Sequence, residues 1–456
     1  MTPSDRRLLS LAFLSLGVLL DFGNLSTAAL ACVLLSLGLC IQSLSARSWG
    51  QPLPRWAGVA VLVALAATTL LYPKKFGSPV ALFLATFAVL AAAILIHSLV
   101  KTRTAKGVAF TLAALSALTS ILANLTWGFA NIDVFGFQQS AAQALLSGQN
   151  PYSPLIPSRN IVAPGVPAWL QLHLPYGPIL PVLEAPFRLL GDVRILHIVA
   201  AVVTSVAALA LARRAGTLDR TASVVMAFPL TIGMVIFSWV DVITMAGLAV
   251  WLVCFRSHPK IATCALVIAL GAKPTTLIAL LPIFFWSIRA RRQVIIAAII
   301  TAVFALPFAM ITGFAQFYHN VLGIQLDLLP RLDSLTLNSY LNSLHLSILP
   351  FAVSALVIAV AAILVLRRRP ATYGDLLSGT AILASVSFLV AKWAYFNYYY
   401  IPAVLLMLAI AGNGLVVDVP EMISPPAVLL RAVEWLRRAR GRGLGRRRVP
   451  AADAGA

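Results

Sequence analysis

Charged residues are scarce in this sequence of 456 residues: only 11% are Asp, Glu, Lys or Arg, whereas 60% are hydrophobic. In soluble globular domains about a quarter of the residues are charged, so this scarcity excludes an ordinary water-soluble fold. A membrane-spanning helix needs roughly 20 apolar residues, and about fourteen such segments fit into the chain. They leave no room for a separate soluble domain, and we expect an integral membrane protein.

Cysteine is also rare, and potential metal ligands do not cluster in the sequence. The four cysteines all fall within apolar segments: Cys32, Cys40, Cys254 and Cys264. No C-x-x-C pair is present, so neither a disulfide framework nor a zinc site is implied. The motif Asn131-Ile-Asp133 holds a single carboxylate, which is a poor site for a hard divalent cation. We therefore predict a protein without metal or cofactor.

Acidic residues are few, at 14 against 34 Lys and Arg, which gives a net charge of +20. We do not expect nucleic-acid binding, because no basic fold with interleaved aromatic residues accompanies the charge. If the N-terminus is cytoplasmic, most basic residues fall on the cytoplasmic side, as the positive-inside rule requires. These are Arg6, Arg7, Arg47, Arg55, Lys101, Arg103, Lys106, Arg213, Arg214, Arg220, Arg256, Lys260, Arg289, Arg291, Arg292, Arg367, Arg368, Arg369 and the tail arginines from Arg431 to Arg448. We predict a plasma (inner) membrane protein with both termini cytoplasmic.

The apolar segments predict an all-α polytopic bundle of about 14 spans, within a range of about 11 to 14. The expected spans are 8–20, 25–44, 56–72, 80–100, 108–129, 193–212, 222–238, 242–255, a hairpin within 261–282 broken at 271–274, then 294–311, 347–366, 376–390 and 400–411. Large outer loops follow the fifth and eleventh spans. The segment 1–20 resembles a signal peptide but lacks a small-residue cleavage site, so we interpret it as a retained first span.

Four regions follow from this pattern. Residues 1–129 form N-terminal helical hairpins, and 130–192 form the first outer loop, which contains an interfacial helix at 133–148 and a half-span at 176–190. Residues 193–412 form the membrane core with a second outer loop at 312–345. Residues 413–456 form a basic cytoplasmic tail, which anionic lipid headgroups would hold.

A series of short motifs follows in order at the expected outer side of this bundle. They are Asn131-Ile-Asp133, Ala144-Leu-Leu-Ser-Gly148-Gln-Asn150-Pro151-Tyr152, Leu174-Pro-Tyr176-Gly-Pro178, Val240-Asp241, Gly271-Ala-Lys273-Pro274, Arg331-Leu-Asp333-Ser334 and Asn397-Tyr-Tyr-Tyr400. With these motifs, residues 130–412 resemble the polytopic lipid-linked glycosyltransferases of the GT-C fold and are most similar to the mannosyltransferase-like group of glycosyltransferase family 87. The first four spans are not explained by the resemblance.

The resemblance implies transfer of a hexose, mannose in that group, from a polyprenyl-phosphate donor to a lipid or glycan acceptor outside the cytoplasm. Such a reaction needs a general base for the acceptor hydroxyl, and a carboxylate at a loop–helix junction suits that role. Asp133 matches the acidic position of the family's first outer loop. The alternative is that Asp133 only caps the helix that follows it.

The leaving phosphate needs cations or oriented donors, and Lys273, Arg331 and Lys392 are the candidates. Each also has a structural interpretation. Lys273 can extend its ammonium to lipid headgroups, Lys392 beside Trp393 can anchor the interface, and Arg331 can pair with an acid of its own loop, Asp327 or Asp333.

Other polar and aromatic residues of the motifs are candidates for binding the sugar or the acceptor: Asn131, Tyr152, Tyr176, Asp241, His319, Asn397 and Tyr398. The tyrosines alternatively belong to an aromatic belt at the membrane interface. Asp241 alternatively forms an ion pair with Lys273, and His319 is alternatively a solvated loop residue.

Proteins of other classes share part of this pattern. A multi-pass transporter or a flippase for lipid-linked sugars is also polytopic and basic inside, but transporters place ionisable residues near the bilayer midplane and contain two related halves. We find no internal repeat, and the ionisable residues lie at the outer ends of spans. A membrane scaffold and an outer-leaflet oligosaccharide polymerase or ligase are further alternatives.

Overall fold

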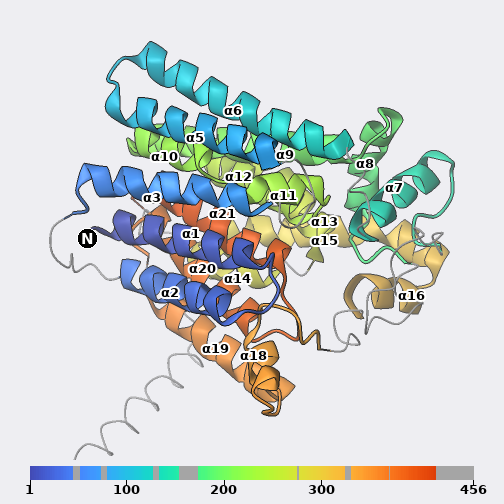
Figure 1. The fold of residues 1–456 in the computed structure, drawn as a ribbon. Coiled ribbons are helices and arrows are strands. Elements are labelled where there is room, and N and C mark those ends of the chain that lie inside the picture. The colour runs from blue at the N-terminus through green and yellow to red at the C-terminus, as the bar shows by residue number, and fades with distance from the viewer. Residues whose placement is uncertain are drawn as a thin grey trace, which may run out of the picture.

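The computed structural model describes residues 1–44, 52–72, 80–126, 133–153, 173–274, 277–323, 330–368 and 370–416. Within these ranges the chain is helical (Figure 1), and strand-like pairing is limited to the isolated bridges Asn24–Ser334 and Thr372–Val416. The helices are α1 (Pro3–Leu20), α2 (Thr27–Ser43), α3 (Arg55–Ala67), the 3-10 helix η1 (Thr68–Leu71), α5 (Val80–Leu99), α6 (Arg103–Thr126), α7 (Asp133–Leu146), α8 (Ile179–Leu189), α9 (Arg194–Ala215), α10 (Leu218–Met226), α11 (Leu230–Ile236), α12 (Asp241–Cys254), α13 (Pro259–Ala272), α14 (Leu277–Trp286), α15 (Ile288–Thr312), α16 (Phe314–Tyr318), the π-helix η4 (His319–Gly323), α18 (Leu337–Ser343), α19 (Phe351–Arg367), α20 (Tyr373–Leu389) and α21 (Phe396–Ala411). The prediction of an all-α fold is confirmed.

Four of the described helices are long and apolar enough to cross a membrane: α5, α6, α9 and α15. A fifth span results if the pair α10 and α11 is counted as one, although its two helices are bent by 49°. The other apolar helices, such as α12 and α21, have 10–17 residues, fewer than the roughly 20 that a perpendicular span needs. The predicted total of about fourteen spans stays a prediction.

The bend between α10 and α11 lies at Pro229, within the segment for which the sequence predicts one continuous span. Proline has no N–H to continue the helical ladder, so the carbonyls of the preceding turn lose a partner. The hydroxyl of Tyr72 donates to the Pro229 carbonyl at 2.9 Å and accepts the N–H of Gly233 at 3.1 Å. A side chain of the N-terminal region thus satisfies backbone groups that the bend exposes.

The break at Lys273 and Pro274 reverses the direction of the chain. Lys273 is extended, as a residue before proline prefers. Lys273 pairs with Asp241 at the start of α12, whereas Trp286, the last residue of α14, packs on Phe255 just beyond the end of α12 with ring centroids 5.0 Å apart. Helix α13 therefore runs toward the Asp241 end of the bundle, and α14 runs back.

The centre of the bundle is formed by α21, which is buried along nearly its whole length and packs on α1, α9, α12 and α20. Helices α15 and α19 lie at the periphery and expose large apolar side chains, including Val303, Met310, Phe351 and Leu356. Large apolar surfaces are rare on soluble monomers. This exposure fits helices whose outer face contacts lipid.

The two ends of the bundle differ in character. The end that contains the N-terminus carries the ion pairs Arg7–Asp375 at 2.7 Å, Arg220–Asp5 at 2.8 Å and Lys106–Asp219. The short helices α7, α8 and α16 gather at the opposite end, on the right in Figure 1. The motifs singled out in the sequence also lie at that opposite end, as described next.

Candidate functional site

A buried ion pair between Asp241 and Lys273 lies at the centre of the site. The Lys273 ammonium donates to both carboxylate oxygens of Asp241, at 2.8 and 2.9 Å, and the side chains are only 8% and 1% exposed. The side-chain amide of Asn397 donates to the same carboxylate at 3.2 Å, and the ring of Tyr398 lies 4.5 Å below the ammonium. Three motifs from α12, α13 and α21 thereby meet at one point.

The Tyr176-Gly-Pro178 motif packs directly on this group. The N–H of Gly177 donates to the carbonyl of Ala272 at 3.0 Å. A Cβ atom at Gly177 would lie 2.0 Å from the carbonyl oxygen of Gly271, so only glycine permits the two backbones to approach this closely. The segment before α8 is in this way fixed against the end of α13, beside Lys273.

Tyr176 lies within electrostatic range of both Asp133 and Asp241. Burial raises the pKa of Tyr176 well above its ordinary value, and the neighbouring charges of Asp133 and Asp241 raise it further, so the phenol stays protonated. A protonated phenol is a hydrogen-bond donor that a bound ligand can use. Residues before α8 and residues of the helices that follow it therefore act on one another electrostatically.

Asp133 is the first residue of α7. Its Oδ1 accepts the N–H of Val134 at 2.8 Å. Burial raises the pKa of Asp133 above its ordinary value, while the Val134 N–H and the positive charge of Arg331 oppose that rise. A carboxylate with a raised pKa is a better proton acceptor than a solvated aspartate, which is the property that a general base requires.

Arg331, which acts electrostatically on Asp133, is paired with Asp333 and stacks on Tyr395. Its guanidinium forms a two-point contact with Asp333, at 3.0 and 2.8 Å, and stacks 5.2 Å from the centre of the Tyr395 ring. The Tyr395 hydroxyl donates to Asp333 at 2.7 Å. The N–H of Arg331 donates to the carbonyl of Lys392 at 3.2 Å, which places the backbones of the two basic residues side by side.

The turn between α1 and α2 supports this loop. The N–H of Leu25 donates to the Asp333 carbonyl at 2.8 Å, and the N–H of Leu335 donates to the Gly23 carbonyl at 2.9 Å. Gly23 has φ +78°, and a Cβ there would lie 2.1 Å from the backbone nitrogen of Phe396. The first helical hairpin, for which the sequence offered no role, therefore holds the segment that carries Arg331.

Tyr152 is buried, with 1% of its surface exposed, and its ring packs on Phe317 and Phe308 with centroids 4.9 and 6.0 Å away. Its hydroxyl donates to the backbone carbonyl of Tyr176 at 2.7 Å. These contacts place Tyr152 behind Tyr176, where it holds the backbone of the site rather than presenting its own ring to a sugar.

The remaining predicted residues are placed as follows. His319 is half-buried at the start of η4, the π-helix next to the cluster of Tyr152 and Phe317. Asn131 lies outside the described residues. Among the described residues, no group of three or more His, Cys, Asp or Glu side chains is arranged to hold a metal ion.

The structure adds Glu184 to the groups that the sequence indicated. Glu184 is fully buried in α8, and neither carboxylate oxygen has a hydrogen-bond partner among the described residues. Burial raises its pKa well above the ordinary value, and Glu184 acts electrostatically on Tyr176. The one sequence signal for it is a lone acid within the short, proline-flanked apolar segment from 179 to 189.

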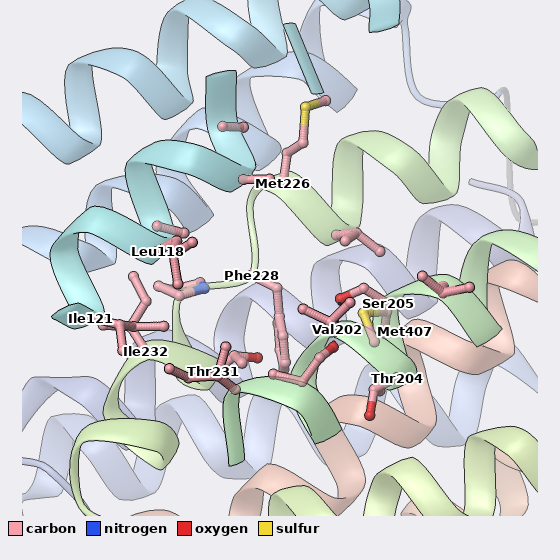
Figure 2. Close-up of a pocket in the computed structure, with 18 of the residues that line it drawn as sticks. Leu118, Ile121, Val202, Thr204, Ser205, Met226, Phe228, Thr231, Ile232 and Met407 are labelled. Carbon is pink, nitrogen blue, oxygen red and sulfur yellow. Dashed lines mark hydrogen bonds between the residues drawn. The ribbon is translucent and has the colours of Figure 1, made fainter. Parts of the chain in front are cut away.

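An apolar cavity of about 230 Å³ lies beside the cluster (Figure 2). It is lined by α6 and α9 and by the residues around the α10–α11 bend, and among the labelled side chains Leu118, Ile121, Val202 and Phe228 are apolar. Tyr400 of α21 also lines it. Its hydroxyl lies 3.4 Å from Thr231, and the carboxylate of Asp241 acts on it electrostatically. Tyr400 thus lines the cavity within electrostatic range of the polar cluster.

Comparison with known proteins identifies one family. The model of glycosyltransferase family 87 matches residues 174–392, slightly less than half of the chain. The matched range includes Tyr176, Asp241, Lys273 and Arg331 and ends at Lys392, whereas Asp133 lies before it. No curated protein matches the chain. No solved structure matches it either.

Proposed function

We propose that the protein is a membrane glycosyltransferase that transfers a sugar, mannose in our assignment, from a polyprenyl-phosphate donor to a lipid or glycan acceptor. The match of the glycosyltransferase family 87 model to residues 174–392 supports this class of enzyme. The observation that carries the proposal is the cluster of Asp133, Tyr176, Asp241, Lys273 and Arg331, which joins one base candidate to several hydrogen-bond donors. The cluster lies at the end of the bundle that the charge pattern assigns to the extracytoplasmic side.

In the proposed reaction the hydroxyl oxygen of the acceptor attacks the anomeric carbon of the donor sugar. The bond between that carbon and the phosphate oxygen breaks, and the polyprenyl phosphate leaves with the electron pair. Asp133 takes the hydroxyl proton, for which its raised pKa is suited. A single displacement of this kind inverts the configuration at the anomeric carbon.

Among the basic residues, Arg331 and Lys392 are assigned to the leaving phosphate. Their backbones are joined by a hydrogen bond, and Arg331 is the cation that acts electrostatically on Asp133. A guanidinium that already contacts one carboxylate at two points still has N–H groups for a phosphate. Lys273 is held by both oxygens of Asp241, and its proposed part is to position Asp241, Asn397 and Tyr398 against the sugar.

The apolar cavity beside Tyr400 is assigned to part of the prenyl chain of the donor. Its volume of about 230 Å³ is smaller than that of typical small-molecule pockets, so it would hold only a section of the chain. Tyr400 lines the cavity and lies within electrostatic range of Asp241 in the polar cluster. Helix α6 forms one wall, which gives the N-terminal helices a part in donor binding.

The decisive experiment measures transfer of radiolabelled mannose from polyprenyl-phosphate mannose by membranes that contain the wild type or Asp133→Asn. The substitution preserves shape and removes the base, so we expect a loss of about 10²- to 10⁴-fold in rate. Asp192→Asn is the matched control, because the Asp192 carboxylate accepts the N–H of Arg194 at the start of α9, at the same end, and pairs with the Arg194 side chain outside the cluster. Folding of all three proteins is verified by thermal unfolding in detergent.

Equal transfer by the wild type and Asp133→Asn would reduce Asp133 to a structural role at the start of α7. If no polyprenyl-phosphate sugar supports transfer to any acceptor, the lipid-linked donor is wrong. Movement of an intact lipid-linked sugar across vesicle membranes without transfer would instead identify a flippase.

A further inference from the structure

A second cavity, of about 260 Å³, lies at the end of the bundle that contains the N-terminus. Its described lining comes from α1, α3, α5, α6 and α10, and most of it precedes residue 174, where the family match begins. Asp5, Leu62, His97 and Ser223 are buried, whereas Arg55 and Asp219 are exposed. The cavity therefore has a closed floor and a charged mouth.

Three basic side chains converge on this cavity: Arg55, Lys106 and Arg220. Within the described residues, Arg55 donates to the carbonyl of Ser98, Lys106 pairs with Asp219, and Arg220 donates to Asp5 at 2.8 Å. Each basic group thus uses a small part of its donor capacity, because a guanidinium and an ammonium both carry several N–H groups. The cavity therefore offers further hydrogen-bond donors to a ligand.

The two carboxylates of the cavity are already supplied with donors. Asp5 accepts the N–H of Thr2 at 2.9 Å and that of Leu53 at 3.2 Å, in addition to the Arg220 contact. Asp219 is 68% exposed and is paired with Lys106. A ligand that enters the cavity therefore meets an excess of donors over acceptors, which selects an anion.

His97 gives an independent indication of a ligand. The side chain is only 6% exposed and lines the cavity, and its Nδ1 has no hydrogen-bond partner among the described residues. Its Nε2 lies 3.1 Å from the carbonyl oxygen of Asp219, so Nε2 carries a proton. An unpartnered buried nitrogen is costly unless a ligand satisfies it.

The surroundings of the cavity favour a lipid over a free anion. Trp56, which follows Arg55, is 74% exposed, and Leu99 at the end of α5 is 65% exposed. Exposed Trp beside basic residues is typical of the headgroup level of a bilayer. Basic pockets between helices on the cytoplasmic side are suited to anionic headgroups. We propose that this cavity binds the phosphate of an anionic phospholipid headgroup.

The test measures lipid binding to the full-length protein in detergent by native mass spectrometry, with phosphatidylglycerol as the probe and phosphatidylcholine as the neutral comparison. The double variant Arg55→Gln/Lys106→Gln removes two cations from the cavity. Since a basic residue near an anionic lipid surface contributes about 1 kcal/mol, we expect phosphatidylglycerol to bind about thirtyfold more weakly. Lys101→Gln/Arg103→Gln is the matched control, because these exposed residues lie at the same end but do not line the cavity.

The expected result is a preference for phosphatidylglycerol in the wild type and the control that is lost in the cavity variant. Equal weakening in both variants would show that overall charge, not this cavity, attracts the lipid. Displacement of phosphatidylglycerol by millimolar inorganic phosphate would identify a site for free phosphate instead. The binding measurement does not depend on sugar transfer, so it stands or falls separately from the proposed function.

Discussion

At the scale of single residues, the environment of Asp133 differs from that of two other acids at this end of the bundle, Asp241 and Asp333. Asp241 is neutralised by the ammonium of Lys273, and Asp333 is held by Arg331 and Tyr395. Burial opposes ionisation of Asp333, but the hydrogen bonds from Arg331 and Tyr395 bring its pKa below the ordinary value. The pKa of Asp133 is shifted in the opposite direction, above its ordinary value. These environments separate two carboxylates suited to structural pairing from one suited to accept a proton.

The first prediction concerns the pH dependence of transfer. Asp133 must be ionised to act as a base, so the rate falls as the pH drops through its pKa, which burial raises and the charge of Arg331 lowers. Arg331→Gln removes the positive charge that lowers the pKa of Asp133. We therefore expect the acid limb of the kcat/KM profile to move to higher pH.

Lys392→Gln is the matched control for this prediction. Lys392 is not among the groups that shift the pKa of Asp133, so Lys392→Gln should leave the acid limb in place. Because Lys392 is assigned to the leaving phosphate, its loss should still lower the rate. A limb that moves equally in both variants, or in neither, would contradict the assignment of Asp133 as the base.

A residue of the site could be predicted where its sequence neighbours alone indicate a functional position. Asp133, Lys273 and Arg331 stand at junctions of polar and apolar segments, and the pairs Asp241–Lys273 and Arg331–Asp333 were among the alternatives that the sequence allowed. Glu184 was not selected as a site residue, because a lone acid in a short apolar segment does not indicate what surrounds it. Its burial results from the packing of α8 on α7, α9 and α13.

At the scale of elements, the sequence predicted where helices begin and end better than how they continue. A helix is present in the segment 133–148, as α7, and the chain reverses near 271–274, at the turn from α13 to α14. The interfacial position of α7 stays a prediction. The span expected at 222–238 is instead a bent pair. The apolar composition of this segment predicts one continuous span and gives no sign of a bend at a proline. The fold accommodates the bend because the hydroxyl of Tyr72 donates to the Pro229 carbonyl.

The turn between α1 and α2 gives a prediction at this scale. Gly23→Ala places a Cβ against the backbone of Phe396 at a residue with φ +78°, a conformation that costs an L-residue about 1 to 2 kcal/mol even without a clash. We expect a lower unfolding temperature in detergent and a transfer rate reduced by displacement of the Arg331 loop.

Gly38→Ala in α2 is the control for this substitution. A Cβ there meets no atom within 4 Å, and alanine favours the helix over glycine by roughly 1 kcal/mol. This variant should be at least as stable as the wild type. If Gly23→Ala retained full stability and transfer, the first hairpin would have no part in supporting the site.

The wall that α6 contributes to the apolar cavity gives a further prediction. Ala117 lines the cavity, and Ala117→Phe would fill part of its volume. We expect a higher KM for a long-chain polyprenyl donor, while a donor analogue with a two-isoprene chain should be used as before. Leu112→Phe, on the exposed face of the same helix, is the control. A KM for the long-chain donor that is unchanged from the wild type in Ala117→Phe would remove this cavity from donor binding.

At the scale of the whole molecule, the bundle has two chemically distinct ends. One carries the ion pairs of Arg7, Lys106 and Arg220, and the other carries the cluster around Asp241. This separation follows from the alternation of basic residues along the sequence, because successive long helices such as α5 and α6 run between the two ends. The number of crossings is less predictable, since many helices are shorter than a bilayer is thick.

The last prediction is the orientation of these ends. In a background without the four natural cysteines, Ser147→Cys, at the exposed turn after α7, should react with a membrane-impermeant maleimide in intact cells. Lys101→Cys, at the exposed junction of α5 and α6, should react only after the membrane is opened, because basic residues concentrate on the cytoplasmic side. The reverse pattern would place Asp133 and Asp241 on the cytoplasmic side. A donor presented in the outer leaflet would then be out of reach of the site, so this one labelling experiment tests the topology and the proposed substrate together.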